Sequence, residues 1–119
     1  MPDVLIEIQG LELAGFHGAL DEERLEGQPF LFDVVLHAHD AGVRSDKLGD
    51  TVDYTAVVAT IREISSGHRF NLIEALAAAV ADVLLERFPV SRVRVRVRTP
   101  QVKLSAPVEW TAATIVRGR

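Results

Sequence analysis

Arginine and valine alternate without interruption from Arg92 to Arg98, with valine at positions 93, 95 and 97. Successive side chains of a β-strand point to opposite faces, so this segment predicts a strand with one apolar face and one strongly charged face. An antiparallel sheet tolerates this asymmetry because it can bury one face and leave the other uncovered. We therefore expect a sheet that is packed against helices on its valine side only.

The remaining pattern supplies three more strands and two helices. Alternation at residues 4–9, 30–38 and 109–116 predicts strands, and helical spacing predicts helices over 54–65 and 71–87. Segments 15–28, 41–50 and 100–107 predict loops, the second with a short helical turn. This order predicts an α+β fold in a single domain over 1–119, with a four-stranded antiparallel sheet and two sequential helices on one face.

The uncovered face of this sheet is expected to be charged, and both edge strands are expected to be exposed. It would carry the arginines of the third strand together with Glu7, Gln9, Asp33 and His37. We expect several subunits to join their sheets edge to edge into a barrel, with these charges paired on its inner wall.

Composition excludes several classes of chemistry. The chain has 119 residues, a net charge of −4 and no cysteine, so thiolate catalysis, disulfides and cysteine-ligated metals are excluded. The acidic balance argues against nucleic acid as a partner, and alternating arginines fit charge pairing better than phosphate recognition. No signal peptide, membrane-spanning stretch, phosphate-binding glycine loop or nucleophile elbow is present. We expect a cytoplasmic protein.

Asn71-Leu72-Ile73-Glu74 is the segment with the most functional information. It places a carboxylate on the first turn of a helix, among unpaired N–H groups and at the positive end of the helix dipole. Such a carboxylate can accept two parallel N–H bonds from a planar edge, such as that of a pterin or guanine. Each charge-assisted bond is worth about 1.5–3 kcal/mol. The alternative needs no ligand: Asn71 as N-cap and Glu74 at the third helical position would form a capping box.

Other candidate residues have simpler alternatives. His17 is more typical of a hydrogen-bonded structural histidine than of a base, and either Thr51 or Asp53 can cap the helix that begins at Tyr54. Tyr54, the only tyrosine, can donate a proton or simply pack. His37 and His39 share a strand face, but no third ligand joins them at metal-site spacing, so we expect no metal.

Taken together, the loop motifs resemble the dihydroneopterin aldolase family of folate biosynthesis. The resemblance covers essentially the whole chain and rests on four segments in order: His17-Gly18-Ala19-Leu20 with Arg24, then Gly27-Gln28-Pro29-Phe30, Asp50-Thr51-Val52-Asp53-Tyr54, and Asn71-Leu72-Ile73-Glu74. It implies the tunnelling fold, with rings of four subunits, commonly paired into octamers, and active sites between neighbours.

The implied reaction is that of a carbon–carbon lyase. Members cleave 7,8-dihydroneopterin by a retro-aldol step into 6-hydroxymethyl-7,8-dihydropterin and glycolaldehyde, without a cofactor, metal or Schiff base. Epimerisation of dihydroneopterin or its triphosphate is the alternative activity, because re-addition after cleavage gives the epimer.

Site residues follow by position from the same resemblance. Glu74 would anchor the pterin, backbone groups of Val52, Leu72 and Ile73 would complete the ring's hydrogen bonds, and Asn71 would shape the loop. Glu23 would lie near the side-chain hydroxyls, and Tyr54 would reach in from the neighbouring subunit to help protonate the enol intermediate. His17 and Ala19 would line the loop beside the substrate.

One position departs from the family pattern. A lysine usually ends the third strand before a proline-rich loop, whereas this chain has Thr99 there. A threonine supplies neither a base near neutral pH nor positive charge, and losing such a charge typically costs about 10²–10³ in rate. Lys103, four residues on, is the candidate replacement. A pterin-binding homologue with weakened turnover is therefore a further alternative.

Overall fold

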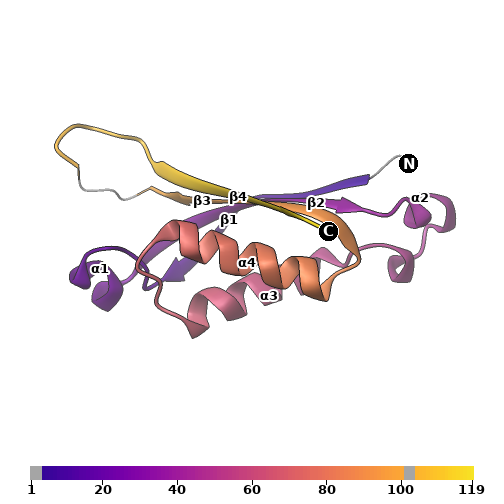
Figure 1. Ribbon diagram of the computed structural model, residues 1–119, viewed down its shortest axis with the longest axis horizontal. Coiled ribbons are helices and arrows are strands. Elements are labelled where there is room, and N and C mark those ends of the chain that lie inside the picture. Colours follow the sequence, from indigo (N-terminus) through magenta and orange to yellow (C-terminus); the bar gives the residue numbers. More distant parts are fainter. Residues whose placement is uncertain (1–3, 101–103) are drawn as a thin grey trace.

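The computed structural model describes residues 4–100 and 104–119. Four antiparallel strands form one sheet in the order β1-β2-β3-β4: Val4–Gly15, Gln28–Ala38, Val90–Thr99 and Thr111–Gly118. The two long helices are α3, Tyr54–Gly67, and α4, Ile73–Arg87, and both lie on one side of the sheet (Figure 1). Shorter elements are α1 at Asp21–Glu26, α2 at Ala41–Ser45 and the 3₁₀ helix η1 at Leu48–Asp50. The predicted α+β class and the single covered face are confirmed.

The alternation of apolar and polar residues along the strands explains which side chains form the core. The apolar sides of β2 and β3 turn toward the helices, and α4 packs against β3 and β4 while α3 packs against β1. The side chains buried in this layer include Phe30, Phe32, Val34, Leu36, Val93, Val95 and Val97 from the strands and Val57, Ile61, Leu76, Val80 and Leu84 from the helices. Removal of this apolar surface from water is the main stabilising contribution.

The charged face is organised around Asp33, which is only 2% exposed. Arg98 donates to its two oxygens at 2.7 and 3.0 Å, and Arg96 donates at 3.0 Å. The Gly10 N–H donates at 2.7 Å from a bulge in β1, where Gly10 has a φ of 67°. Trp110 lies against both guanidinium groups, 5.4 and 5.6 Å from its ring. Asp33 therefore finds its partners within one chain.

Three of the differences from the expected element boundaries matter most here. β1 continues past residue 9 to Gly15, because the bulge between Ile8 and Leu11 shifts the alternation without ending the strand. Segment 15–28, expected to be a loop, contains α1. Helix α4 begins at Ile73 after an extended Leu72 at the N-cap, so Asn71 lies outside the helix.

The sheet has two ends that are far apart. Val4 pairs with Ala38 at one end of β1 and Gly15 pairs with Gln28 at the other. At about 3.3 Å per residue, the twelve residues of β1 separate these ends by roughly 35 Å. Figure 1 shows α1 and the α3–α4 connection at one end and α2 at the other.

Candidate active site

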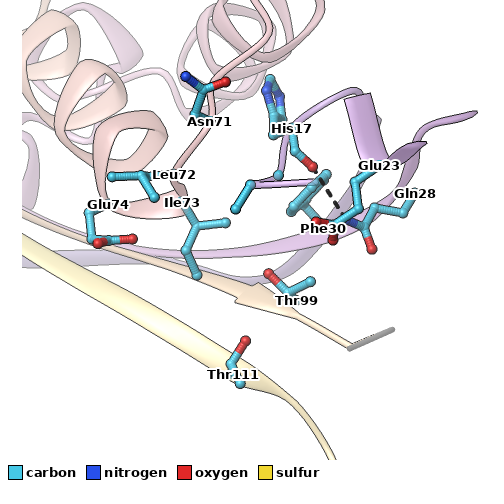
Figure 2. Close-up of a pocket in the computed structure, with 12 residues that line it drawn as sticks. His17, Glu23, Gln28, Phe30, Asn71, Leu72, Ile73, Glu74, Thr99 and Thr111 are labelled. Carbon is cyan, nitrogen blue, oxygen red and sulfur yellow. Dashed lines mark hydrogen bonds between the residues drawn. The ribbon is translucent and has the colours of Figure 1, made fainter. Parts of the chain in front are cut away.

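A cavity of about 180 Å³ lies at the α1 end of the sheet. Its walls come from the segment after β1, the start of α4 and the neighbouring ends of three strands. Figure 2 shows the start of α4, with Glu74, on one side and Glu23 and Gln28 on the other. The lining residues are His17, Gly18, Ala19, Glu23, Gln28, Phe30, Asn71, Leu72, Ile73, Glu74, Thr99 and Thr111.

Glu74 is the second residue of α4, and its carboxylate has no partner within the described residues. The N-cap is Leu72, which offers no side-chain acceptor, so the capping-box alternative for Asn71 and Glu74 is wrong. The first hydrogen bond of the helix is from the Leu76 N–H to the Leu72 carbonyl at 3.2 Å. The preceding N–H groups and the helix dipole therefore favour negative charge at this wall. Glu74 is available to a ligand.

Glu23, on α1, is held by two hydrogen bonds. Its Oε1 accepts from the Leu20 N–H at 3.0 Å, and its Oε2 accepts from Gln28 Nε2 at 3.2 Å. Gly18, with a φ of 150°, allows the close approach, because a Cβ there would lie 2.7 Å from Glu23 atoms. The carboxylate is therefore fixed at the cavity wall opposite Glu74.

Gln28 is a site residue that no sequence pattern had indicated. Its Nε2 donates both to Glu23 and, at 3.3 Å, to the carbonyl of His17. The sequence feature that could have indicated this role is the position of Gln28 directly after a glycine, at the start of β2. That glycine, Gly27, has a φ of 78°. A polar residue at that boundary faces the loop that precedes it.

His17 is fully buried, with 0% of its surface exposed. The Phe70 N–H donates to its Nδ1 at 3.0 Å, and its Nε2 lies 3.1 Å from Ser65 Oγ. Burial lowers the pKa of His17 below its usual value of 6.5, and the nearby His68 acts in the same direction, while the Ser65 contact opposes them. The structural interpretation of His17 is the one that this geometry supports.

Thr99 ends β3 beside the cavity, is 6% exposed and pairs with Thr111 across the sheet. Among the described residues that line this cavity, two are carboxylates and none is a lysine or arginine. Lys103, the candidate replacement for the family lysine, lies outside the described residues.

Val52 and Tyr54 lie at the other end of the sheet. They border a second cavity of about 430 Å³, together with Val4, Ile6, His39, Gly42, Val43, Asp46, Lys47, Leu48 and Thr51. Tyr54 is 63% exposed, and Asp53 is the N-cap, with its carboxylate accepting from the Thr55 N–H at 2.9 Å. One chain therefore brings together Glu23 and Glu74 but leaves Tyr54 at the far end of α3, whose fourteen residues span about 20 Å.

Two features are absent from the described parts of the chain. No three His, Asp or Glu side chains there converge as possible metal ligands. Within residues 4–100 and 104–119, none of the helices has the length and apolar character needed to cross a lipid bilayer.

Known proteins are similar along the whole chain. The family model described as FolB, dihydroneopterin aldolase, matches residues 6–116. A dihydroneopterin aldolase of Streptomyces coelicolor is 34% identical, covering 96% of this chain and 97% of its own. One from Methylorubrum extorquens is 38% identical, covering 96% and 89%. The crystal structure of Escherichia coli dihydroneopterin aldolase in complex with neopterin is 28% identical with a TM-score of 0.89, covering 97% and 99%.

Proposed function

This chain belongs to the dihydroneopterin aldolase family, and from that membership and its cavity we propose that it cleaves 7,8-dihydroneopterin in folate biosynthesis. The products are 6-hydroxymethyl-7,8-dihydropterin and glycolaldehyde. The observation that carries the proposal is the Glu74 carboxylate at the start of α4, which has no partner among residues 4–100 and 104–119 and faces a cavity that also holds Glu23. We propose that residues 1–119 act as one catalytic domain.

Glu74 anchors the pterin in this proposal. The amino-pyrimidinone edge of a pterin presents two N–H groups in parallel, which match the two oxygens of a carboxylate. Backbone groups of Leu72 and Ile73, which also line the cavity, take the remaining polar atoms of the ring, and Asn71 shapes the loop that leads to them. The E. coli relative was solved with neopterin, a pterin of the same class, which supports this choice of ligand.

Glu23 then faces the three-carbon side chain of the substrate, with Ala19 beside it. Its carboxylate accepts the proton of the 2′-hydroxyl, the C1′–C2′ bond breaks, and C2′ leaves as the aldehyde carbon of glycolaldehyde. The bonding electrons pass to C1′ and into the ring imine, which acts as the electron sink. Protonation at C1′ gives the hydroxymethyl product. The step needs neither a metal nor a Schiff base, because the reduced ring itself accepts the electrons.

The Tyr54 side chain and backbone groups of Val52 reach this site from a neighbouring chain. Their own cavity lies at the far end of the sheet and is bordered by exposed apolar side chains, with Tyr54 at 63%, Leu48 at 66% and Val43 at 72% exposure. Such a patch is typical of an interface. In a homo-tetrameric ring, or a pair of rings, each site would combine the Glu74 end of one chain with the Tyr54 end of the next.

A mixing experiment tests this composite site. Glu74→Gln and Tyr54→Phe chains, each nearly inactive alone, are denatured, combined in equal amounts and refolded together. Random assembly would give about one site in four with both residues intact, so about a quarter of the parental activity should return. The control refolds each variant alone at the same total concentration. A mixture no more active than the two controls, or a parent that elutes as a monomer at micromolar concentration, would contradict the composite site.

The direct test of the activity uses 7,8-dihydroneopterin and an assay for glycolaldehyde. Release of glycolaldehyde with formation of 6-hydroxymethyl-7,8-dihydropterin supports the enzyme. Thr99 in place of the lysine favours one second candidate, a pterin-binding protein with weak turnover, since about 10²–10³ in rate would be lost with the missing charge. Tight binding of the substrate without release of glycolaldehyde would select that candidate.

A further inference from the structure

His17 lies where the two walls of the cavity meet. From one wall, the Phe70 N–H donates to its Nδ1 at 3.0 Å, and the Gly18 N–H donates to the Phe70 carbonyl at 2.9 Å. Residues 17–18 and Phe70 are thus joined by two hydrogen bonds, one of them through the imidazole. Phe70 directly precedes Asn71-Leu72-Ile73-Glu74, so this junction sets where the start of α4 lies.

The same residue is tied to the opposite wall. Gln28 Nε2 donates to the His17 carbonyl at 3.3 Å and to Glu23 Oε2 at 3.2 Å. A continuous series of hydrogen bonds therefore runs from the Glu23 carboxylate through Gln28 and His17 to Phe70. The acid that faces the substrate side chain and the segment that carries Glu74 are held to each other through one histidine.

The two ring contacts define one state of the imidazole. A backbone N–H can only donate, so Nδ1 must be the unprotonated acceptor in its contact with Phe70. Nε2 then carries the proton and donates to Ser65 Oγ, 3.1 Å away on α3. The ring is also enclosed by Phe30 and Phe70, with centroids at 5.2 and 5.5 Å, and has no exposed surface. It cannot act on substrate itself.

We propose that His17 is a positioning residue, which as a neutral Nε2–H imidazole holds the start of α4 at the distance from Glu23 that a bound pterin requires. The proposal rests on the proposed function for the identity of the ligand. It assigns His17 an action through Phe70 rather than contact with the substrate.

Isosteric variants separate the two ring contacts. In His17→Asn the amide oxygen can occupy the Nδ1 position and accept from Phe70, whereas in His17→Gln the amide nitrogen can reach Ser65 but Phe70 loses its acceptor. Ser65→Ala is the matched control, because it removes the other ring contact and leaves Phe70 paired. Affinity is measured with neopterin as the probe. Hydrogen exchange in the ligand-free protein measures how well the Phe70 amide is protected. Nitrogen NMR of the parent shows which ring nitrogen of His17 carries the proton.

The expected pattern is selective. His17→Gln should weaken neopterin binding about tenfold and speed exchange of the Phe70 amide about as much, while His17→Asn recovers most of the affinity and Ser65→Ala keeps it within about twofold. The proposal is overturned if the parent imidazole carries its proton on Nδ1, or if affinity falls in all three variants in proportion to their loss of stability. A parent that binds no neopterin would overturn the proposed function, whereas the tautomer and the exchange of the Phe70 amide would still decide whether His17 positions the start of α4.

Discussion

Glu74→Gln is expected to lower kcat/KM for 7,8-dihydroneopterin by about 10²–10⁴. Glutamine has nearly the same size but replaces one acceptor oxygen with an NH₂ group, which would face an N–H of the pterin edge. Two charge-assisted hydrogen bonds, each worth about 1.5–3 kcal/mol, are lost or inverted. The Glu74 carboxylate makes no cap within the described structure, so the substitution should affect the fold little. Loss of the interaction between this charge and the helix dipole should lower the free energy of unfolding by about 0.3–1 kcal/mol.

Glu86→Gln is the matched control for that variant. Glu86 is an exposed glutamate on the same helix, far from the cavity, and its substitution removes the same charge. Isothermal titration with neopterin and steady-state kinetics should show parental values for Glu86→Gln and greatly weakened binding for Glu74→Gln. Full affinity for neopterin in Glu74→Gln would remove the anchor and, with it, the basis of the proposed function.

Asp33→Asn is expected to lower the free energy of unfolding by about 3 kcal/mol. Asp33 is nearly completely buried and accepts from Arg96, Arg98 and the Gly10 N–H. Removing one partner of a buried ion pair leaves the other charges uncompensated, which typically costs about 3–5 kcal/mol. The arginines are partly exposed, at 31% and 20% of their side chains, so water offsets part of the loss. Urea unfolding of parent and variant measures the difference.

The pH dependence of that difference provides the second check. Burial alone would raise the pKa of Asp33, but the hydrogen bonds from Arg98, Gly10 and Arg96 outweigh it and hold the pKa below its usual value of 3.8. The carboxylate therefore contributes stability that is fully present above about pH 3.8 and is lost as the pH falls through the folded-state pKa. The advantage of the parent over Asp33→Asn should shrink in that acidic range.

Glu12→Gln supplies the control for charge removal on the same face. Glu12 lies on β1 and is exposed, so its substitution should change stability by less than about 0.5 kcal/mol. An Asp33→Asn variant as stable as Glu12→Gln at neutral pH would show that Arg96 and Arg98 do not need the Asp33 charge to keep the fold stable.

The periodicity of apolar residues was sufficient to predict the sheet and helix layers of this fold. The valines and arginines from 92 to 98 separate into a buried and a charged face because a strand repeats every two residues wherever it is placed. Helices α3 and α4 likewise follow from their spacing of apolar residues. The motifs around His17, Gly27, Tyr54 and Asn71 pointed to the family, which the comparisons confirm. These are local properties that can be read along the chain.

Local sequence patterns gave wrong or missing predictions where contacts with distant segments determine the structure. The N-cap of α4 is Leu72 rather than Asn71, and Phe70 beside it is paired with His17 and Gly18 from across the fold. Gln28 gains its role only because Glu23 and the His17 carbonyl lie within reach of one amide. Spacing along the chain carries no information about such contacts, because each joins segments whose separation depends on how the whole sheet packs.

The family and the layered α+β architecture thus follow from residue order, since periodicity and short motifs act within a few residues of one another. The partners of buried groups do not: the pairing of Asp33 with two arginines and the burial of His17 between both cavity walls required the folded chain. So did the placement of Tyr54 and Glu74 in the walls of two different cavities. Long-range contacts arise from packing, and packing satisfies all segments at once.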